Sequence, residues 1–142
     1  MGDRGNIVIE TNGDRIYLYS HWSGRDLPTI LKNALASKQG RGRWNDESYL
    51  TKIIFGFMLE GNDPKDEIGF GISTTLGDGE YALLVVNVDL KKVYLESDGS
   101  HEIGQNTQSW SFEEYAALPN VDWEYSNNYK NIGLTTNLKN DE

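Results

Sequence analysis

Apolar residues at every second position mark the start of the chain. Ile7 and Ile9 occupy alternate positions before Asn12-Gly13, and Ile16 and Leu18 do so after it. Such alternation is typical of strands with one buried face. The Asn-Gly pair suits the two positive-φ positions of a tight hairpin turn. This segment therefore predicts a β-hairpin.

Two amphipathic helices are predicted after the hairpin. Asp26 caps the first, and Pro28 fits its first turn because a proline nitrogen there gives up no hydrogen bond. Residues 45–47 begin the second with negative charge at its amino end, and Gly61 marks its stop. The apolar stripes consist of Leu27, Ile30, Leu31, Ala34 and Leu35 in the first, and of Leu50, Ile53, Ile54, Phe57 and Met58 in the second.

Strand periodicity returns at Ile68, Phe70 and Ile72, with small residues between them. Residues 81–88 are nearly all apolar, as expected of a central strand covered on both faces. A turn then leads into residues 93–96, which complete a meander. Farther on, the S-x-x-E pattern at residues 111–114 is a capping box and predicts a short helix.

The predicted fold class is therefore α+β, with the order β-β-α-α-β-β-β-α. Hairpin-type connections indicate an antiparallel sheet of about five strands, with the two main helices on one face and a short C-terminal helix. Residues 1–120 form a single α+β domain, and residues 121–142 an acidic, asparagine-rich tail. Trp123, Tyr125 and Tyr129 would fasten part of this tail, and about ten residues at its end would be mobile.

Composition narrows the class of protein. The chain has 142 residues, the size of one domain, and no cysteine, which removes disulfides, thiolate metal sites and cysteine nucleophiles. Its amino end is polar, and no apolar run is long enough to span a bilayer. We therefore expect a cytoplasmic protein with neither a signal peptide nor a membrane partner.

The net charge of −9 is unevenly distributed. Residues 1–97 hold 14 acids and 11 bases, whereas residues 98–142 hold 8 acids and 2 bases. Because binding to nucleic acid depends on Lys and Arg displacing counterions, this balance argues against a general nucleic-acid-binding surface. One basic island stands against the acidic background, with the cations Arg25, Lys32, Lys38, Arg41, Arg43 and Lys52.

The island contains a candidate ligand site for a nucleotide-like molecule. Guanidinium groups bind phosphate in a bidentate fashion, and an indole face can stack on a base. The candidate ligand-binding residues are His21, Trp22, Arg25, Arg41, Arg43 and Trp44. They would converge if both helices began at the same end of the sheet. The alternative is a solvated arginine loop with Trp44 packed into the core.

His21 is also the basis of another hypothesis, that the protein is a small hydrolase. An acid-base pair would need a carboxylate, such as Asp26 or Glu47, to orient its imidazole. The alternative is a structural pair with Trp22 that packs the end of the hairpin against a helix.

The acidic C-terminal third is a candidate surface for a protein partner. Its carboxylates either serve solubility or complement a basic partner, such as one that normally holds nucleic acid. The candidate partner-binding residues are Glu113, Glu114, Asp122, Trp123, Glu124 and Tyr125.

We predict no metal ion and no cofactor. The carboxylates of Asp63, Asp66 and Glu67 lack the spacing of a calcium loop, and two histidines give little support for zinc. The glycine pairs at residues 69–71 and 77–79 precede no predicted helix and no Gly-Lys-Ser/Thr sequence, so neither is a nucleotide-binding fingerprint.

Four segments together resemble a known family: residues 2–8 (GDRGNIV), 17–24 (YLYSHWSG), 41–50 (RGRWNDESYL) and 68–81. In these segments the chain is similar to a family of small proteins, without an assigned activity, that bacterial, archaeal and phage genomes encode. The resemblance covers residues 2–118. It implies a genomic setting and implies no catalytic residues.

Three hypotheses of function follow from these observations. The first is a non-catalytic acidic interaction protein, a phage-associated inhibitor or anti-defence protein that binds a host macromolecule in the host cytoplasm. The second is a module that sequesters a nucleotide-like signal with its arginine and tryptophan residues. The third is a small hydrolase that uses His21.

Overall fold

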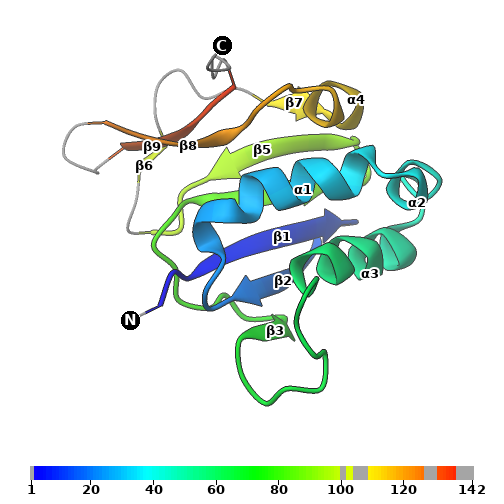
Figure 1. Ribbon diagram of the computed structural model, residues 1–142. Helices are drawn as coiled ribbons and strands as arrows, with labels where there is room; N and C mark the ends of the chain where they lie inside the picture. The colour runs from blue at the N-terminus through cyan, green and yellow to red at the C-terminus, as the bar shows by residue number, and fades with distance from the viewer. Residues whose placement is uncertain (1, 100–101, 104–108, 127–130, 137–142) are drawn as a thin grey trace, which may run out of the picture.

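The computed structural model describes residues 2–99, 102–103, 109–126 and 131–136 (Figure 1). In this part of the chain, six strands form the main sheet in the order β3-β2-β1-β4-β5-β7. Their bounds are β1 Gly5–Thr11, β2 Asp14–Ser20, β3 Phe70–Ser73, β4 Leu83–Asn87, β5 Lys92–Glu96 and β7 Trp110–Ser111. The predicted α+β class is confirmed.

The predicted hairpin is confirmed in its register and in its turn. Strands β1 and β2 pair antiparallel from Gly5 opposite Ser20 to Thr11 opposite Asp14. Asn12 and Gly13 between them have φ values of 52° and 82°, the left-handed conformation that the Asn-Gly pair predicts.

The prediction of a wholly antiparallel sheet was wrong at one pair of strands. β4 lies beside β1 and runs parallel to it, with Ile7 opposite Leu84. After β3 the chain returns to the end of the sheet where β1 begins, and there the Glu80 N–H donates to the Arg4 carbonyl over 2.9 Å. The chain therefore enters β4 in the direction of β1. A hairpin connection had been assumed where the chain makes a crossover.

The helices occupy one face of the main sheet, with α1 and α3 side by side across it (Figure 1). Asp46 caps α3 by accepting the Tyr49 N–H over 3.2 Å, whereas Asp26 makes no side-chain cap and instead ends the short turn η1. The helical elements are η1 Gly24–Asp26, α1 Leu27–Ala36, α2 Lys38–Arg41, α3 Glu47–Met58 and α4 Phe112–Ala116. Ser111 and Glu114 form the predicted capping box of α4.

Helix α2 was not predicted, because its four residues carry no apolar stripe. Ser37 begins α2 by accepting the Gly40 N–H over 2.9 Å. A Cβ on Gly40 would collide with the carbonyl of Ala34, so glycine allows the chain to fold back this closely against α1.

The core lies between the sheet and the two main helices, as the apolar stripes predict. Side chains from both layers are at most 2% exposed there. Among them are Ile7, Ile9, Leu18, Leu84 and Val86 from the strands, and Leu27, Leu31, Leu35, Leu50, Ile54 and Met58 from the helices.

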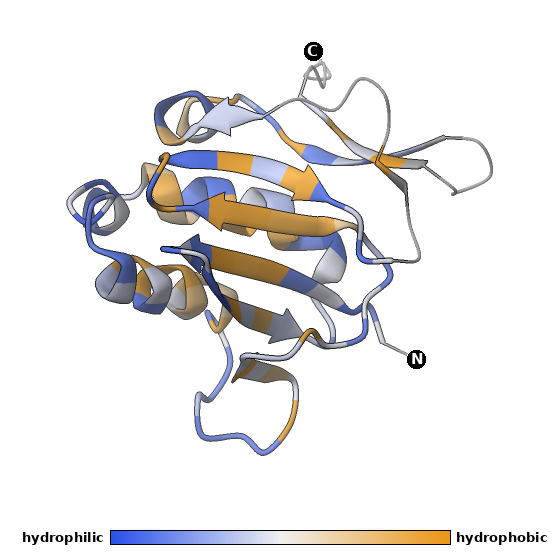
Figure 2. Ribbon diagram, turned by 180° about the vertical axis from the view of Figure 1, so that it is seen from behind, coloured by the Kyte–Doolittle hydropathy of each residue, from blue (hydrophilic) through white to orange (hydrophobic). Residues whose placement is uncertain are grey.

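No described helix covers the other face of the sheet, which Figure 2 shows from behind. Val8 and Val85 are nevertheless fully buried there, because Tyr17 and Tyr94 pack against their cluster. The prediction that residues 81–88 contain a central strand is therefore confirmed, with β4 lying between β1 and β5 and buried on both faces.

A second sheet follows α4, with the order β6-β9-β8 and the bounds β6 Glu102–Ile103, β8 Asp122–Ser126 and β9 Asn131–Thr135. Two strands of this sheet lie in the segment that had been assigned to a tail. Trp123 stacks on Tyr81 with ring centroids 5.0 Å apart, and its indole N–H donates to the Gly24 carbonyl over 3.0 Å. Residues 137–142 of the predicted mobile end lie outside the described residues. Within the described residues, no helix combines the length and the apolar character needed to cross a membrane.

We predict that Trp123→Ala lowers the free energy of unfolding by about 3–5 kcal/mol, the range for removing a large buried aromatic side chain. Trp123 is 8% exposed, and its replacement removes both the stack on Tyr81 and the hydrogen bond to Gly24. Urea denaturation followed by circular dichroism measures the change. The exposed neighbour Glu124 is the control, and Glu124→Ala should stay within about 0.5 kcal/mol. Equal stability of the two variants would show that Trp123 does not anchor β8 to the rest of the domain.

Candidate functional site

The predicted nucleotide-binding residues lie in two places. His21, Trp22 and Arg25 lie where β2 ends and α1 is about to begin. The cluster at residues 41–44 starts at the last residue of α2, beyond the far end of α1 (Figure 1). Helix α1 has ten residues and therefore spans about 15 Å. The two helices begin at opposite ends of the sheet, so the six residues do not converge on one ligand.

In the cluster at residues 41–44, the groups that would bind a nucleotide already contact other residues of the protein. Trp44 is half-buried, and its indole N–H donates to the Leu35 carbonyl over 3.1 Å. The guanidinium of Arg41 lies 5.1 Å from the Trp44 ring centroid and 3.6 Å from a carboxylate oxygen of Glu113. That of Arg43 lies 3.3 Å from Asp46. The indole and both cations thus have partners within the protein.

Arg25 belongs to a polar cleft of about 260 Å³ between α1 and residues 119–122. The cleft also contains Lys32, Asp26 and Asp122, so that two cations and two carboxylates line it together. Arg25 is mostly exposed and lies 3.6 Å from Asp3. This mixture of charges does not select an anionic ligand.

The partner of the His21 ring is a tyrosine hydroxyl. Its Nδ1 lies 3.0 Å from the Tyr19 hydroxyl, and its ring meets the edge of Trp22 at a centroid distance of 5.3 Å. Glu47 begins α3 at the opposite end of the sheet. The hydrolase hypothesis therefore lacks the geometry with Glu47 that it requires.

The candidate partner-binding residues of the C-terminal third differ in their availability. Trp123 is buried, Glu114 accepts the Ser111 N–H in the capping box, and Glu113 lies beside Arg41. Asp122 and Glu124 on β8 are exposed, and Tyr125 is 38% exposed. The aromatic anchor expected on this surface is thus part of the core.

Tyr81 ties this region to the amino end of the chain. Its hydroxyl donates to Asp3 over 2.5 Å, and its ring lies on Trp123. Burial raises the pKa of the Tyr81 phenol far above its ordinary value, and the hydrogen bond to Asp3 adds to this shift because ionised Asp3 favours the neutral phenol.

A different surface combines exposed apolar side chains with a cavity. It lies where α3 ends beside the edge strand β3, and we call it the β3 surface. Trp22, Ile68 and Ile72 are 48%, 66% and 57% exposed there, three of the seven large hydrophobic side chains that are exposed in the described chain. A groove of about 230 Å³ runs along it, lined by Phe55, Leu59, Asp63, Pro64, Asp66, Ile68, Phe70, Gly71 and Ile72.

Local backbone contacts fix the start of β3. Gly69 has a φ of +104°, and its carbonyl accepts the His21 N–H over 2.8 Å. The ring of Trp22 lies where a Cβ on Gly69 would be, so only glycine allows this contact. Trp22 is thus held against β3 with about half of its surface exposed.

The same hydrogen bond shows which backbone groups of β3 face outward. In the antiparallel ladder with β2, Gly69 opposite His21 is a hydrogen-bonded pair, as are Gly71 and Ser73 two and four positions on. The N–H and C=O groups of Phe70 and Ile72 therefore point away from β2. No described strand lies on that side of β3.

An acidic loop lies beside the β3 surface, and two of its carboxylates, Asp63 and Asp66, line the groove. Residues 60–67 hold the four acids Glu60, Asp63, Asp66 and Glu67 against one base, Lys65, and all five are exposed. Asp63 organises this loop, because its carboxylate accepts the Lys65 N–H over 2.9 Å. The surface is therefore apolar along the strand and negatively charged beside it.

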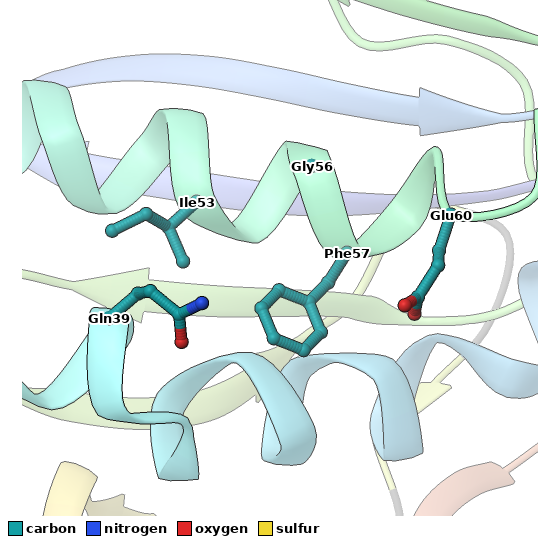
Figure 3. Close-up of a pocket in the computed structure, with 5 residues that line it drawn as sticks. All are labelled: Gln39, Ile53, Gly56, Phe57 and Glu60. Carbon is teal, nitrogen blue, oxygen red and sulfur yellow. The ribbon is translucent and has the colours of Figure 1, made fainter. Parts of the chain in front are cut away.

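A second groove, of about 280 Å³, lies on the other flank of α3. Figure 3 shows Ile53 and Phe57 of α3, and Glu60 just after its end, reaching toward α1, with Gln39 of α2 opposite. Gly56 contributes no side chain, and Glu60 is the one carboxylate in this lining. Such a lining offers apolar contact and lacks the paired groups of acid-base chemistry.

Sequence reasoning missed the β3 surface although its signals were present. The exposed acids had been weighed only as metal ligands, and within the described residues no three His, Asp or Glu side chains gather to hold a metal ion. Ile68, Phe70 and Ile72 had been assigned to a strand whose place in the sheet was unknown. The acidic loop directly before an apolar strand is the signal that could have located this surface.

We predict that Tyr81 makes the protein sensitive to high pH. The folded state favours the neutral phenol, so its contribution to stability is complete below about pH 10, the unfolded pKa, and is lost as the pH rises further. Tyr81→Phe should reduce the alkaline slope of the free energy of unfolding by up to about 1.4 kcal/mol per pH unit. Denaturation curves between about pH 9 and 12 measure this slope. The exposed Tyr49 is the control, and an unchanged slope in Tyr81→Phe would contradict the prediction.

Comparisons with known proteins give no match to a family model, to a curated protein or to a solved structure. The resemblance of residues 2–118 to small proteins of bacterial, archaeal and phage genomes therefore stays a prediction. The function is therefore inferred from the chemistry of the described surfaces.

Proposed function

We propose that the protein is a non-catalytic interaction protein that binds a basic region of another protein at the β3 surface. The observation that carries the proposal is the conjunction, at one sheet edge, of outward backbone groups, exposed isoleucines and an apolar groove.

Exposed apolar side chains support a protein partner. Stable interfaces have an apolar centre, often with an aromatic anchor, and a polar rim. At the β3 surface Ile68 and Ile72 would form the centre and Trp22 the anchor, while the acids of residues 60–67 would form the rim. Large contiguous apolar patches are uncommon on monomeric proteins unless they serve binding.

The charge of the surface favours a basic partner. Four acids against one base lie within residues 60–67, and the whole chain carries −9. Complementary charge speeds association and rejects acidic partners, and its effect weakens as salt screens it. In the cytoplasm of a host cell, a phage-encoded protein of this kind would inhibit its target by occupying a surface that the target needs.

The nucleotide and hydrolase hypotheses receive less support from the geometry. The arginine and tryptophan residues lie at opposite ends of α1, and His21 bonds to Tyr19. The β3 surface uses one of those residues, Trp22, in a different role.

We predict that reversing charge beside β3 weakens partner binding far more than the same reversal elsewhere. Asp66→Lys with Glu67→Lys should lose about 90% or more of the protein captured from host lysate at low salt, since the rim would then repel a basic partner. Both side chains are exposed, so folding should persist. Quantitative mass spectrometry of matched pull-downs measures the captured proteins.

The matched control is Glu113→Lys with Glu124→Lys, which changes the net charge equally on the C-terminal surface. It should retain the partners that the parent protein captures. If the control loses them and the variant beside β3 keeps them, the binding surface is the C-terminal one and the proposal is wrong. If neither variant differs from the parent protein, electrostatic binding at β3 is also wrong.

A further inference from the structure

We infer that the partner contributes an extended segment that adds to the sheet as a strand beside β3, with alternating apolar residues and basic residues at its ends. This inference rests on the proposed function and specifies the mode of binding. Strand addition is a common form of peptide recognition, in which backbone hydrogen bonds give affinity and pockets for alternate side chains give specificity.

The backbone of β3 supplies the hydrogen bonds. The N–H and C=O groups of Phe70 and Ile72 point away from β2, spaced as a strand ladder requires. The other edge of the main sheet, β7, has two residues and continues directly into α4. Among the edges of the main sheet in the described residues, β3 is therefore the suitable template.

The groove supplies the place for side chains. Phe70 lies opposite Ser20 and Ile72 opposite Leu18, so both face the helix side of the sheet. Phe55 and Leu59, at the end of α3, line the groove with them. Every second side chain of an added strand would lie over this groove. On the opposite face the neighbouring positions of β3 are Gly71 and Ser73, which leave room for the remaining side chains.

The four residues of β3 include none of the side chains that commonly block pairing at edge strands. Natural edges are blocked by lysine, proline, bulges or inward-pointing charges. Phe70–Ser73 contains none of these residues, and Ile72 at its centre is 57% exposed. This edge is open to pairing.

Charge distinguishes the partner strand from a second copy of the chain. Two β3 edges brought together would place Asp63, Asp66 and Glu67 of both copies near one junction, where like charges repel. A segment with lysine or arginine at its ends meets the same carboxylates favourably. The acids therefore select a basic strand.

The test uses a synthetic peptide of about seven residues in which valine and isoleucine alternate with threonine and lysine occupies both ends. Calorimetry should show binding to the full chain that weakens with salt, and glutamate at both ends should reduce the affinity by about tenfold or more. In NMR hydrogen exchange, the amides of Phe70 and Ile72 should become protected by about tenfold or more when the peptide is present.

Ile72→Pro isolates the backbone contribution. Because the Ile72 N–H points outward, proline there removes a donor to the added strand without removing a bond to β2. It should reduce peptide affinity by about tenfold, whereas Ile72→Val, which keeps the N–H, should stay within about threefold. Circular dichroism confirms that both variants fold. If Ile72→Pro unfolds, a peptide with N-methylated backbone amides takes its place and should lose affinity equally.

Each other outcome overturns the inference. No binding at about 1 mM peptide, or binding without protection of Phe70 and Ile72, excludes strand addition. A dimer in sedimentation that Ile72→Pro converts to a monomer would assign the edge to a second copy. If the peptide fails while Asp66→Lys with Glu67→Lys still loses the lysate partner, the proposed function stands and only this mode of binding is wrong.

Discussion

Burial of two helical stripes on one face of the sheet is the constraint on which the other features depend. Leu31 of α1 and Ile54 of α3 are fully buried against Ile7 and its neighbours, so both helices must lie on the same side. This leaves the end of α3 beside the margin of the sheet. Phe55 and Leu59 at that end line a groove together with β3, and no further strand lies beyond β3 in the described chain. The packing that forms the core therefore also forms an apolar groove at the edge.

Sequence patterns predicted the features that depend on nearby residues. The turn at Asn12, the two apolar stripes and the capping box at Ser111 are local, and the structure contains all of them. The parallel pairing of β1 with β4 escaped prediction because alternation shows which face of a strand is buried and does not identify its neighbour. The same limit concealed that β3 is an edge.

The candidate site was predictable only in part, for a related reason. Trp22 was singled out from its neighbours in sequence, yet its role depends on contact with Gly69, which is distant in the chain. Trp123 had been predicted to fasten part of the tail, which is confirmed, and had also been placed on a binding surface because it lies among acidic residues. Its stack on Tyr81 and its bond to Gly24 bury it, and neither contact has a periodic signal in the sequence.

The acids of residues 60–67 reconcile an exposed apolar edge with solubility. An open strand that bears exposed isoleucines would pair with copies of itself, and repulsion between like charges opposes that pairing. In the proposed function the same charges would attract a basic chain, so one set of side chains would both limit self-association and select a partner. Their position beside β3, with Asp63 and Asp66 lining the groove itself, makes this double effect local to the edge. Charge spread evenly over the surface would confer solubility and would not distinguish one strand edge from another.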